Sequence, residues 1–155
     1  MASNIPSQNH SEEWLENLRA SGYRMTGPRV AVVEILADSP RALSPNEVYD
    51  LARAHYPTLG LVSVYRTLEK LEQMGLIQRV HLPDGCHAYI AAFSGHQHLL
   101  VCQKCGVTSF FRGDNLSGLI SRVEQESGYQ VNEHWLQLFG ICEDCKDTGI
   151  SEDLC

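Results

Sequence analysis

Two CxxC motifs, Cys102/Cys105 and Cys142/Cys145, stand about one small αβ unit apart in the C-terminal part of the chain. Each motif presents two thiolates from one tight turn, and four thiolates are the ligands that a tetrahedral Zn²⁺ ion requires. A redox dithiol is the alternative, but that motif normally occurs once, at a helix N-terminus, whereas both pairs here border predicted strands. The spacing therefore predicts a closed Cys₄ zinc site that holds structure and leaves no open position for catalysis.

The length limits the number of domains, and the N-terminal sequence bears on the compartment in which the protein is expected. At 155 residues, it is long enough for one ordinary domain or for two small ones. Residues 1–13 contain neither the basic nor the apolar region of a signal peptide. The longest apolar runs, such as 90–93, are too short to span a bilayer. The sequence predicts a cytoplasmic protein without a membrane segment, in which thiols stay reduced and bind metal.

The N-terminal half has the pattern of helices followed by a hairpin. Apolar spacing predicts four helices, over residues 12–20, from 26 to 38, from Ser44 onward with Val48, Leu51 and Ala52 turned inward, and 63–74. Ser44 and Glu47 form a capping box, and Ser63 is expected to cap the fourth helix. Strands at 76–82 and 87–92 flank the turn at 83–85. This order predicts a winged helix-turn-helix, with the hairpin as its wing.

The C-terminal half reads as a small αβ domain around the CxxC motifs. Strands are expected at 98–102 and 107–111, and a helix at 116–127 with Leu119, Ile120 and Val123 turned inward. The apolar run within 131–141 favours a strand covered on both faces. We expect an α+β protein with these parts: a winged-helix domain at 1–92, a hinge at 93–95, a metal-binding domain at 96–146 and a flexible acidic tail at 147–155.

The charge distribution leaves room for a nucleic-acid partner. The formal net charge is -7, but residues 1–95 carry 8 basic against 10 acidic side chains and are nearly neutral. The N-terminal end of the fourth helix carries polar and basic residues, and this is the end of a recognition helix that contacts bases and phosphates. An ordinary charged surface helix is the alternative. The predicted DNA contacts are Arg24, Arg29, Ser63, Tyr65, Arg66, Thr67 and Lys70.

Histidines gather near the hinge and suggest a second metal site. His96 and His98 are two residues apart on a predicted strand, so both project to one face and can chelate one ion. His134 precedes the strand that leads to the second CxxC motif. His81, Cys86 and His87 cluster around the turn of the wing, where a solvated surface role is the alternative. A metal at a hinge can bias the orientation of the two halves.

Four segments together resemble the ferric uptake regulator family: residues 22–29 (GYRMTGPR), 64–68 (VYRTL), 96–106 (HQHLLVCQKCG) and 140–145 (GICEDC). The resemblance covers residues 12–146. It implies a winged helix, a C-terminal αβ dimerisation domain, a Cys₄ structural zinc at Cys102, Cys105, Cys142 and Cys145, and metal-activated repression of operators bound by a homodimer. The implied partner is double-stranded operator DNA, with no small-molecule substrate.

The chain also departs from the family pattern. A sensor site that is common in the family matches Ala42, Ile90, Gln97, Leu99 and Phe110 here, so that site is expected to be missing. A second family site is matched by His96, His98 and His134, while Ser117 stands where an acidic ligand is usual. The hypothesis is a regulatory site of His96, His98, His134 and Cys86, with His81, His87 and Asp114 as further candidates for the missing ligand.

A thiolate among imidazoles favours Zn²⁺ over the harder Mn²⁺ and over an oxygen-rich Fe²⁺ site. The sequence therefore predicts a zinc-activated repressor of zinc uptake genes, with Zn²⁺ as both the structural and the regulatory ion. An iron- or manganese-responsive regulator of the same family is the alternative. A peroxide sensor, a zinc hydrolase and a zinc ribbon that does not bind DNA are weaker rivals, because the chain lacks the residues or the surface pattern that each would need.

Overall fold

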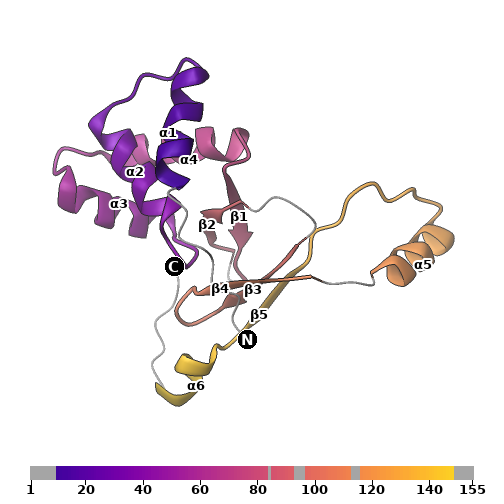
Figure 1. The fold of residues 1–155 in the computed structure, drawn as a ribbon. Helices are drawn as coiled ribbons and strands as arrows, with labels where there is room; N and C mark the ends of the chain where they lie inside the picture. The colour runs from indigo at the N-terminus through magenta and orange to yellow at the C-terminus, as the bar shows by residue number, and fades with distance from the viewer. Residues whose placement is uncertain (1–9, 84, 93–96, 113–115, 149–155) are drawn as a thin grey trace.

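The computed structural model describes residues 10–83, 85–92, 97–112 and 116–148. Its elements are α1 (His10–Ala20), α2 (Gly27–Ala37), α3 (Pro45–His55), α4 (Leu61–Gln73), β1 (Ile77–His81), β2 (His87–Ala91), β3 (His98–Cys102), β4 (Thr108–Phe111), α5 (Ser117–Ser127), β5 (Gln137–Gly140) and α6 (Glu143–Thr148). Four helices lead into the β1–β2 hairpin, and a three-stranded sheet follows (Figure 1). The predicted α+β class with an N-terminal winged helix-turn-helix is confirmed.

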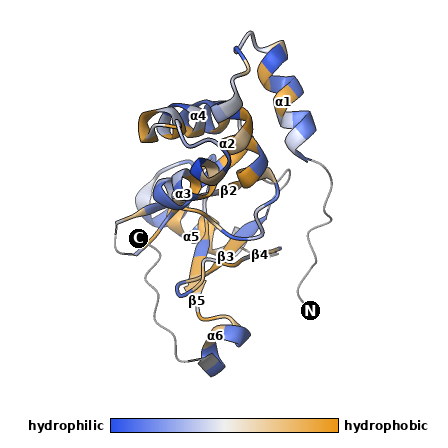
Figure 2. Cartoon of the chain, turned by 90° about the vertical axis from the view of Figure 1, so that its left-hand side faces the viewer, coloured by the Kyte–Doolittle hydropathy of each residue, from blue (hydrophilic) through white to orange (hydrophobic). Residues whose placement is uncertain are grey.

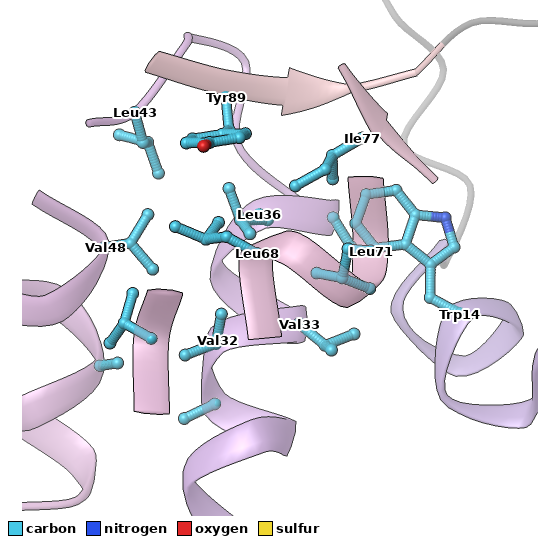
Figure 3. Close-up of a cluster of buried hydrophobic side chains, with 14 of the residues drawn as sticks. Trp14, Val32, Val33, Leu36, Leu43, Val48, Leu68, Leu71, Ile77 and Tyr89 are labelled. Carbon is cyan, nitrogen blue, oxygen red and sulfur yellow. The ribbon is translucent and has the colours of Figure 1, made fainter. Parts of the chain in front are cut away.

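The inward faces of α1 to α4 meet in one hydrophobic core, part of which Figure 3 shows. Leu68 and Leu71 of α4 are at most 1% exposed, and both were predicted to face inward. In α3, Val48 and Ala52 are buried, but Leu51 is 46% exposed. The prediction that Leu51 faces the core is wrong, because the narrow apolar stripe of α3 follows the spacing of Val48 and Ala52 along the helix.

The predicted capping box of α3 is confirmed. The Ser44 hydroxyl accepts a hydrogen bond from the Glu47 amide at 3.2 Å, and the Ser44 amide donates to the Glu47 carboxylate at 2.8 Å. Glu47 also pairs with Arg41 at 2.5 Å. Pro45 adds a residue whose fixed φ suits the first helical position. The start of α3 is therefore fixed by side chains that are all local in sequence.

Replacing Ser44 with alanine should lower the free energy of unfolding by about 1 kcal/mol, because the Glu47 amide loses its acceptor. Denaturant unfolding measures the change. Ser63→Ala is the matched control, since Ser63 lies exposed in the first turn of α4, where no side chain caps the helix, and it should stay within about 0.5 kcal/mol. Equal losses in the two variants would contradict a specific role for the capping box.

The start of α4 differs from the sequence-based expectation. Gly60 is the N-cap residue and Leu61 begins the helix, so the prediction that Ser63 caps α4 is wrong. The Ser63 carbonyl instead accepts a hydrogen bond from the Thr67 hydroxyl at 2.8 Å. Gly75 has φ 69° directly after the helix, as its predicted terminating role requires. The helix therefore gains an additional half-turn at its N-terminal end, the end that was predicted to meet DNA.

The C-terminal sheet has strand order β4-β3-β5, in which β3 runs antiparallel to β4 and parallel to β5. The strand β5 is shorter than expected, and Figure 2 shows its hydrophobic colouring. Leu138 on β5 is 43% exposed and Trp135 just before it is 74% exposed. The prediction of a strand covered on both faces is therefore wrong for a single chain.

Helix α5 ends at Gly128, as predicted, but it is set apart from the sheet in Figure 1 and buries none of its residues. Leu119 is 56% exposed and Val123 is 44% exposed, so their expected inward packing does not occur within the chain. The apolar spacing of α5 was correctly recognised, but none of the residues that the structure describes covers that face. The predicted flexible tail is also wrong at 147 and 148, which belong to α6; residues 149–155 lie outside the described residues.

A second hydrophobic cluster joins the two halves. We call it the junction cluster; it contains Ala42, Val80, Leu82, Ala88, Ile90, Leu99 and Val101, with Cys86, Phe110 and Phe139 packed against it. The segment before α3 adds backbone bonds to both halves: the Ala42 amide donates to the Gly106 carbonyl at 3.0 Å, and the Leu43 amide donates to Tyr89 at 2.9 Å. The wing and the sheet thus share a core, although the proposed hinge at 93–95 lies outside the described residues.

Candidate metal centre

Four cysteines from distant parts of the chain meet at one end of the C-terminal sheet. Their sulfur atoms all lie within 4.8 Å of one another. Cys102 ends β3, Cys105 follows in the turn toward β4, and Cys142 and Cys145 lie at the start of α6. The Gln103 amide donates to the Gly140 carbonyl at 2.9 Å, which ties the two CxxC turns together. The predicted Cys₄ cluster is confirmed.

The cluster fits a tetrahedral metal. With bonds of about 2.3 Å from Zn²⁺ to each sulfur, neighbouring sulfurs of a regular tetrahedron stand about 3.8 Å apart. The Cys105 and Cys142 sulfurs are separated by 3.7 Å. Cys102 is 4% exposed and accepts a hydrogen bond from the Cys142 amide at 3.4 Å. A metal held here would have four protein ligands and no position for substrate, which is the property of a structural site.

The pKa values of the cysteine thiols show why a bound cation would stabilise the ionised cluster. Burial raises the pKa of Cys102, but the backbone N–H groups of Cys142, Cys105 and Lys104 donate to its sulfur and lower its pKa to about 6. The hydrogen-bonded Cys142 sulfur raises the pKa of Cys145 to about 12. One thiolate therefore forms readily, whereas the last resists ionisation beside its neighbours. A bound divalent cation would stabilise all four thiolates together.

A pair of histidines lies in a separate pocket at the other end of β3. His98 is 3% exposed, and its ring centroid lies 5.5 Å from that of the half-buried His134. Two imidazoles on one tetrahedral ion place their centroids roughly 5 Å apart. The pocket has a volume of about 180 Å³, and its wall includes Gln78 of the wing and Gln137 of β5. The structure thus brings together two of the four residues of the hypothesised regulatory site.

The other candidate ligands are placed differently. Cys86 packs against the junction cluster with Leu99 and Val101, and neighbouring residues of a strand point to opposite faces, so Cys86 lies across the sheet from the His98 side chain. His81 and His87 pair across the wing strands with ring centroids 5.1 Å apart, and both are exposed. His96 and Asp114 lie outside the described residues. Among the described residues, the Cys₄ cluster is the one group of three or more candidate ligands.

The expected loss of the commoner sensor site has a structural counterpart. Four of its five matching positions, Ala42, Ile90, Leu99 and Phe110, belong to or pack against the junction cluster. Ala42, Ile90 and Leu99 are at most 3% exposed. Apolar packing therefore occupies the place where polar ligands would be needed.

The predicted DNA contacts fall into two groups on the surface. Ser63, Tyr65 and Arg66 are exposed near the start of α4, with Tyr65 at 49%. Thr67 is 3% exposed and its hydroxyl bonds to the helix backbone, so it offers no surface for DNA. Thr67 and its neighbour Leu68 both lie on the buried face of α4, so we remove Thr67 from the predicted DNA contacts.

The second group surrounds Tyr23. The Arg29 guanidinium lies 5.8 Å and the Lys70 ammonium 5.7 Å from the centre of the Tyr23 ring. Arg29 also donates to the Arg24 carbonyl. Cation–π contacts thus gather basic groups from α2 and α4 on one side of the winged helix. Tyr23 was not predicted as a contact, although an aromatic residue directly before Arg24 was the available signal.

Arg79 of the wing was also missed. Its guanidinium pairs with Glu72 of α4 at 2.7 Å and lies 5.6 Å from the centre of the Tyr89 ring. The hydrogen bond to Glu72 raises the pKa of Arg79, and burial raises the pKa of Tyr89. A pocket of about 360 Å³ opens beside them toward Tyr65 and Arg66. Sequence patterns could not reveal this contact, because it joins a helix to the strand that follows it across a turn.

A winged helix joined through a shared core to a sheet with a four-cysteine metal cluster defines a metal-binding protein of the transcription-regulator class. The model of the ferric uptake regulator family matches residues 20–139. The chain belongs to this family and is a metal-responsive transcriptional regulator. No helix among the described residues has the length and apolarity needed to cross a membrane.

Individual relatives agree on the family. The chain is 30% identical to the ferric uptake regulation protein of Neisseria meningitidis over 136 residues, 87% of this chain and 94% of that protein. It is 30% identical to the ferric uptake regulation protein of Bacillus subtilis over 142 residues, 89% of this chain and 95% of that one. The solved structure of a zinc uptake regulator with zinc and DNA has a TM-score of 0.69 at 17% identity, covers 94% of this chain and 99% of its own, and shows a shared fold.

Proposed function

We propose that this protein is a zinc-activated repressor that binds operator DNA as a homodimer and controls zinc uptake genes. The observation that carries the proposal is the His98–His134 pair, which lies in a pocket beside the wing and apart from the Cys₄ cluster. A closed four-thiolate site suits a permanently held Zn²⁺ ion, whereas a pocket open to solvent suits an ion that exchanges. The Cys₄ site would therefore stabilise the fold, and the histidine pocket would bind the regulatory ion.

The imidazole pair supports zinc as the regulatory ion. His98 and His134 supply nitrogen ligands, which suit Zn²⁺ better than Mn²⁺, and the proposed third ligand is His96. Because Cys86 packs on the other face of the sheet, we no longer include it. His81 and His87, which pair with each other on the wing, are left out as well, whereas Asp114 lies outside the described residues and stays a candidate for a further ligand. When bound, the ion would tie the segment around His134 to β3.

Iron is the second candidate for the sensed metal. The relatives at 30% identity are ferric uptake regulation proteins, and imidazole also binds Fe²⁺. Against iron, the apolar junction cluster replaces the polar positions of the commoner sensor site. Mn²⁺ is the hardest of the three candidate ions, and the imidazole ligands suit it least.

Exposed apolar surface supports a homodimer. Leu119 and Val123 of α5, with Trp135 and Leu138 around β5, are each more than 40% exposed. β5 is also an edge of its sheet, where unpaired backbone groups can join a second copy. A dimer would place two copies of α4, each with exposed Tyr65 and Arg66, against two half-sites of an operator.

Selection of randomised DNA duplexes by the zinc-loaded protein, followed by fluorescence anisotropy on the selected duplex, tests this proposal. Zn²⁺ should raise affinity at a lower free concentration than Fe²⁺ under anaerobic conditions, or than Mn²⁺. Arg66→Ala should weaken binding by about 1–3 kcal/mol if Arg66 reads a base. Arg53→Ala is the control, because Arg53 is an exposed arginine that stacks on Tyr49 of α3. Tighter response to Fe²⁺ would move the assignment to iron.

A further inference from the structure

The side chain of Gln137 connects β5 to the wing. Its amide nitrogen donates to the Arg79 carbonyl at 3.3 Å, and its amide oxygen accepts from the His81 backbone N–H at 3.3 Å. These are the two backbone groups that a neighbouring strand would otherwise pair with. One side chain therefore extends the hydrogen bonding of β1 across to the C-terminal sheet.

Gln137 also belongs to the segment that carries His134. Two residues separate them, and the carbonyl of one of these, Leu136, accepts from the Leu99 amide at 3.2 Å. Leu99 is the immediate neighbour of His98 on β3 and pairs with Gln137 across the sheet. His98, His134 and Gln137 all line the same pocket of about 180 Å³. An ion held by the two histidines would therefore fix the backbone from which Gln137 reaches the wing.

The contact continues from the wing to the recognition helix. Arg79 accepts the Gln137 hydrogen bond through its carbonyl, and its guanidinium pairs with Glu72 of α4 at 2.7 Å. The chain of direct contacts thus runs from His134 through Gln137 and Arg79 to Glu72. Each step is a hydrogen bond, an ion pair or a short stretch of the same backbone, which is the kind of contiguous network that can carry coupling.

We propose that Gln137 is the positioning residue that couples the histidine pocket to the wing and to α4. This inference rests on the proposed function of the pocket as a regulatory metal site. The junction cluster holds the wing against the sheet whatever the state of the pocket, whereas the paired hydrogen bonds of Gln137 depend on the placement of the segment 134–137. The amide sets the angle of the wing in response to the pocket.

The test uses full-length protein with its Cys₄ metal in place and measures operator affinity with and without added Zn²⁺. The unaltered protein should respond about 5- to 150-fold, the usual range of coupling between two sites. Gln137→Met keeps the length of the side chain but removes both hydrogen bonds, and should reduce the response to about twofold or less. Gln130→Met is the matched control, because Gln130 is an exposed glutamine outside the pocket and should retain the full response.

A second variant and a second readout separate coupling from folding. Gln137→Glu retains an acceptor for the His81 amide but places a carboxylate against the Arg79 carbonyl, so it should also reduce the response. In Gln137→Met, Zn²⁺ affinity in the absence of DNA should stay unchanged, and operator DNA should no longer tighten it, because coupling is reciprocal. A full response in Gln137→Met and Gln137→Glu overturns the role of Gln137 alone. Absence of a response in the unaltered protein overturns the proposed regulatory site itself.

Discussion

Replacing Cys102 with serine should release the Cys₄ metal and unfold the C-terminal sheet. Cys102 is the thiolate that forms most readily, because three backbone N–H groups donate to its sulfur, and it ends β3, the central strand. Structural zinc contributes roughly 10–16 kcal/mol to the folding of small zinc domains, so losing it exceeds what a sheet of this size gains from packing. We expect the sheet to melt well below the winged helix.

Metal content per chain by mass spectrometry and thermal unfolding by circular dichroism measure this result. The unaltered protein should hold one tightly bound zinc per chain at the Cys₄ cluster, and Cys102→Ser should lose it. Ser109→Ala is the control, since Ser109 is an exposed residue of β4 outside the cluster. A Cys102→Ser protein that keeps both its metal and its melting temperature would show that these cysteines do not hold a structural ion.

Replacing His134 with alanine should abolish the metal response while leaving the fold intact. His134 is half-buried and lies outside the regular strands, so its removal disturbs little packing. Its imidazole is one of two that meet in the pocket, and its loss would leave the proposed site with His98 and His96, too few protein ligands to hold Zn²⁺ tightly. The metal-dependent change in operator affinity should fall from about 5- to 150-fold to about onefold.

Operator titration at low and high free Zn²⁺ measures the effect of His134→Ala, and the melting temperature shows whether the fold has survived. His87→Ala serves as the matched control: His87 is an exposed wing histidine that pairs with His81 rather than with the pocket. An unchanged response in His134→Ala, or an equal loss in His87→Ala, would place the regulatory ligands elsewhere.

Local signals in the sequence predicted local structure well. The Ser44–Glu47 capping box, the glycine after α4 and the paired CxxC turns each depend on residues close together in sequence, and all three are confirmed. Ser63 failed as a cap because α4 begins at Leu61, so Ser63 already lies inside the first turn of the helix.

Contacts between distant segments were harder to predict. Cys86 and His98 are close in the sequence, yet the alternation of side chains along β3 separates them by the thickness of the sheet. Gln137 had no signal, because a glutamine in an apolar run looks like an interruption of the strand. The apolar faces of α5 and β5 were recognised, but within the described part of the chain these faces stay exposed.

Titration of Zn²⁺ into protein that already holds its Cys₄ metal, with operator affinity followed by fluorescence anisotropy, tests the central claim most directly. The regulatory role of the His98–His134 pocket predicts that operator affinity rises about 5- to 150-fold as one further ion binds per chain. Binding of that ion with no change in operator affinity, or an affinity already at its maximum before zinc is added, would contradict it.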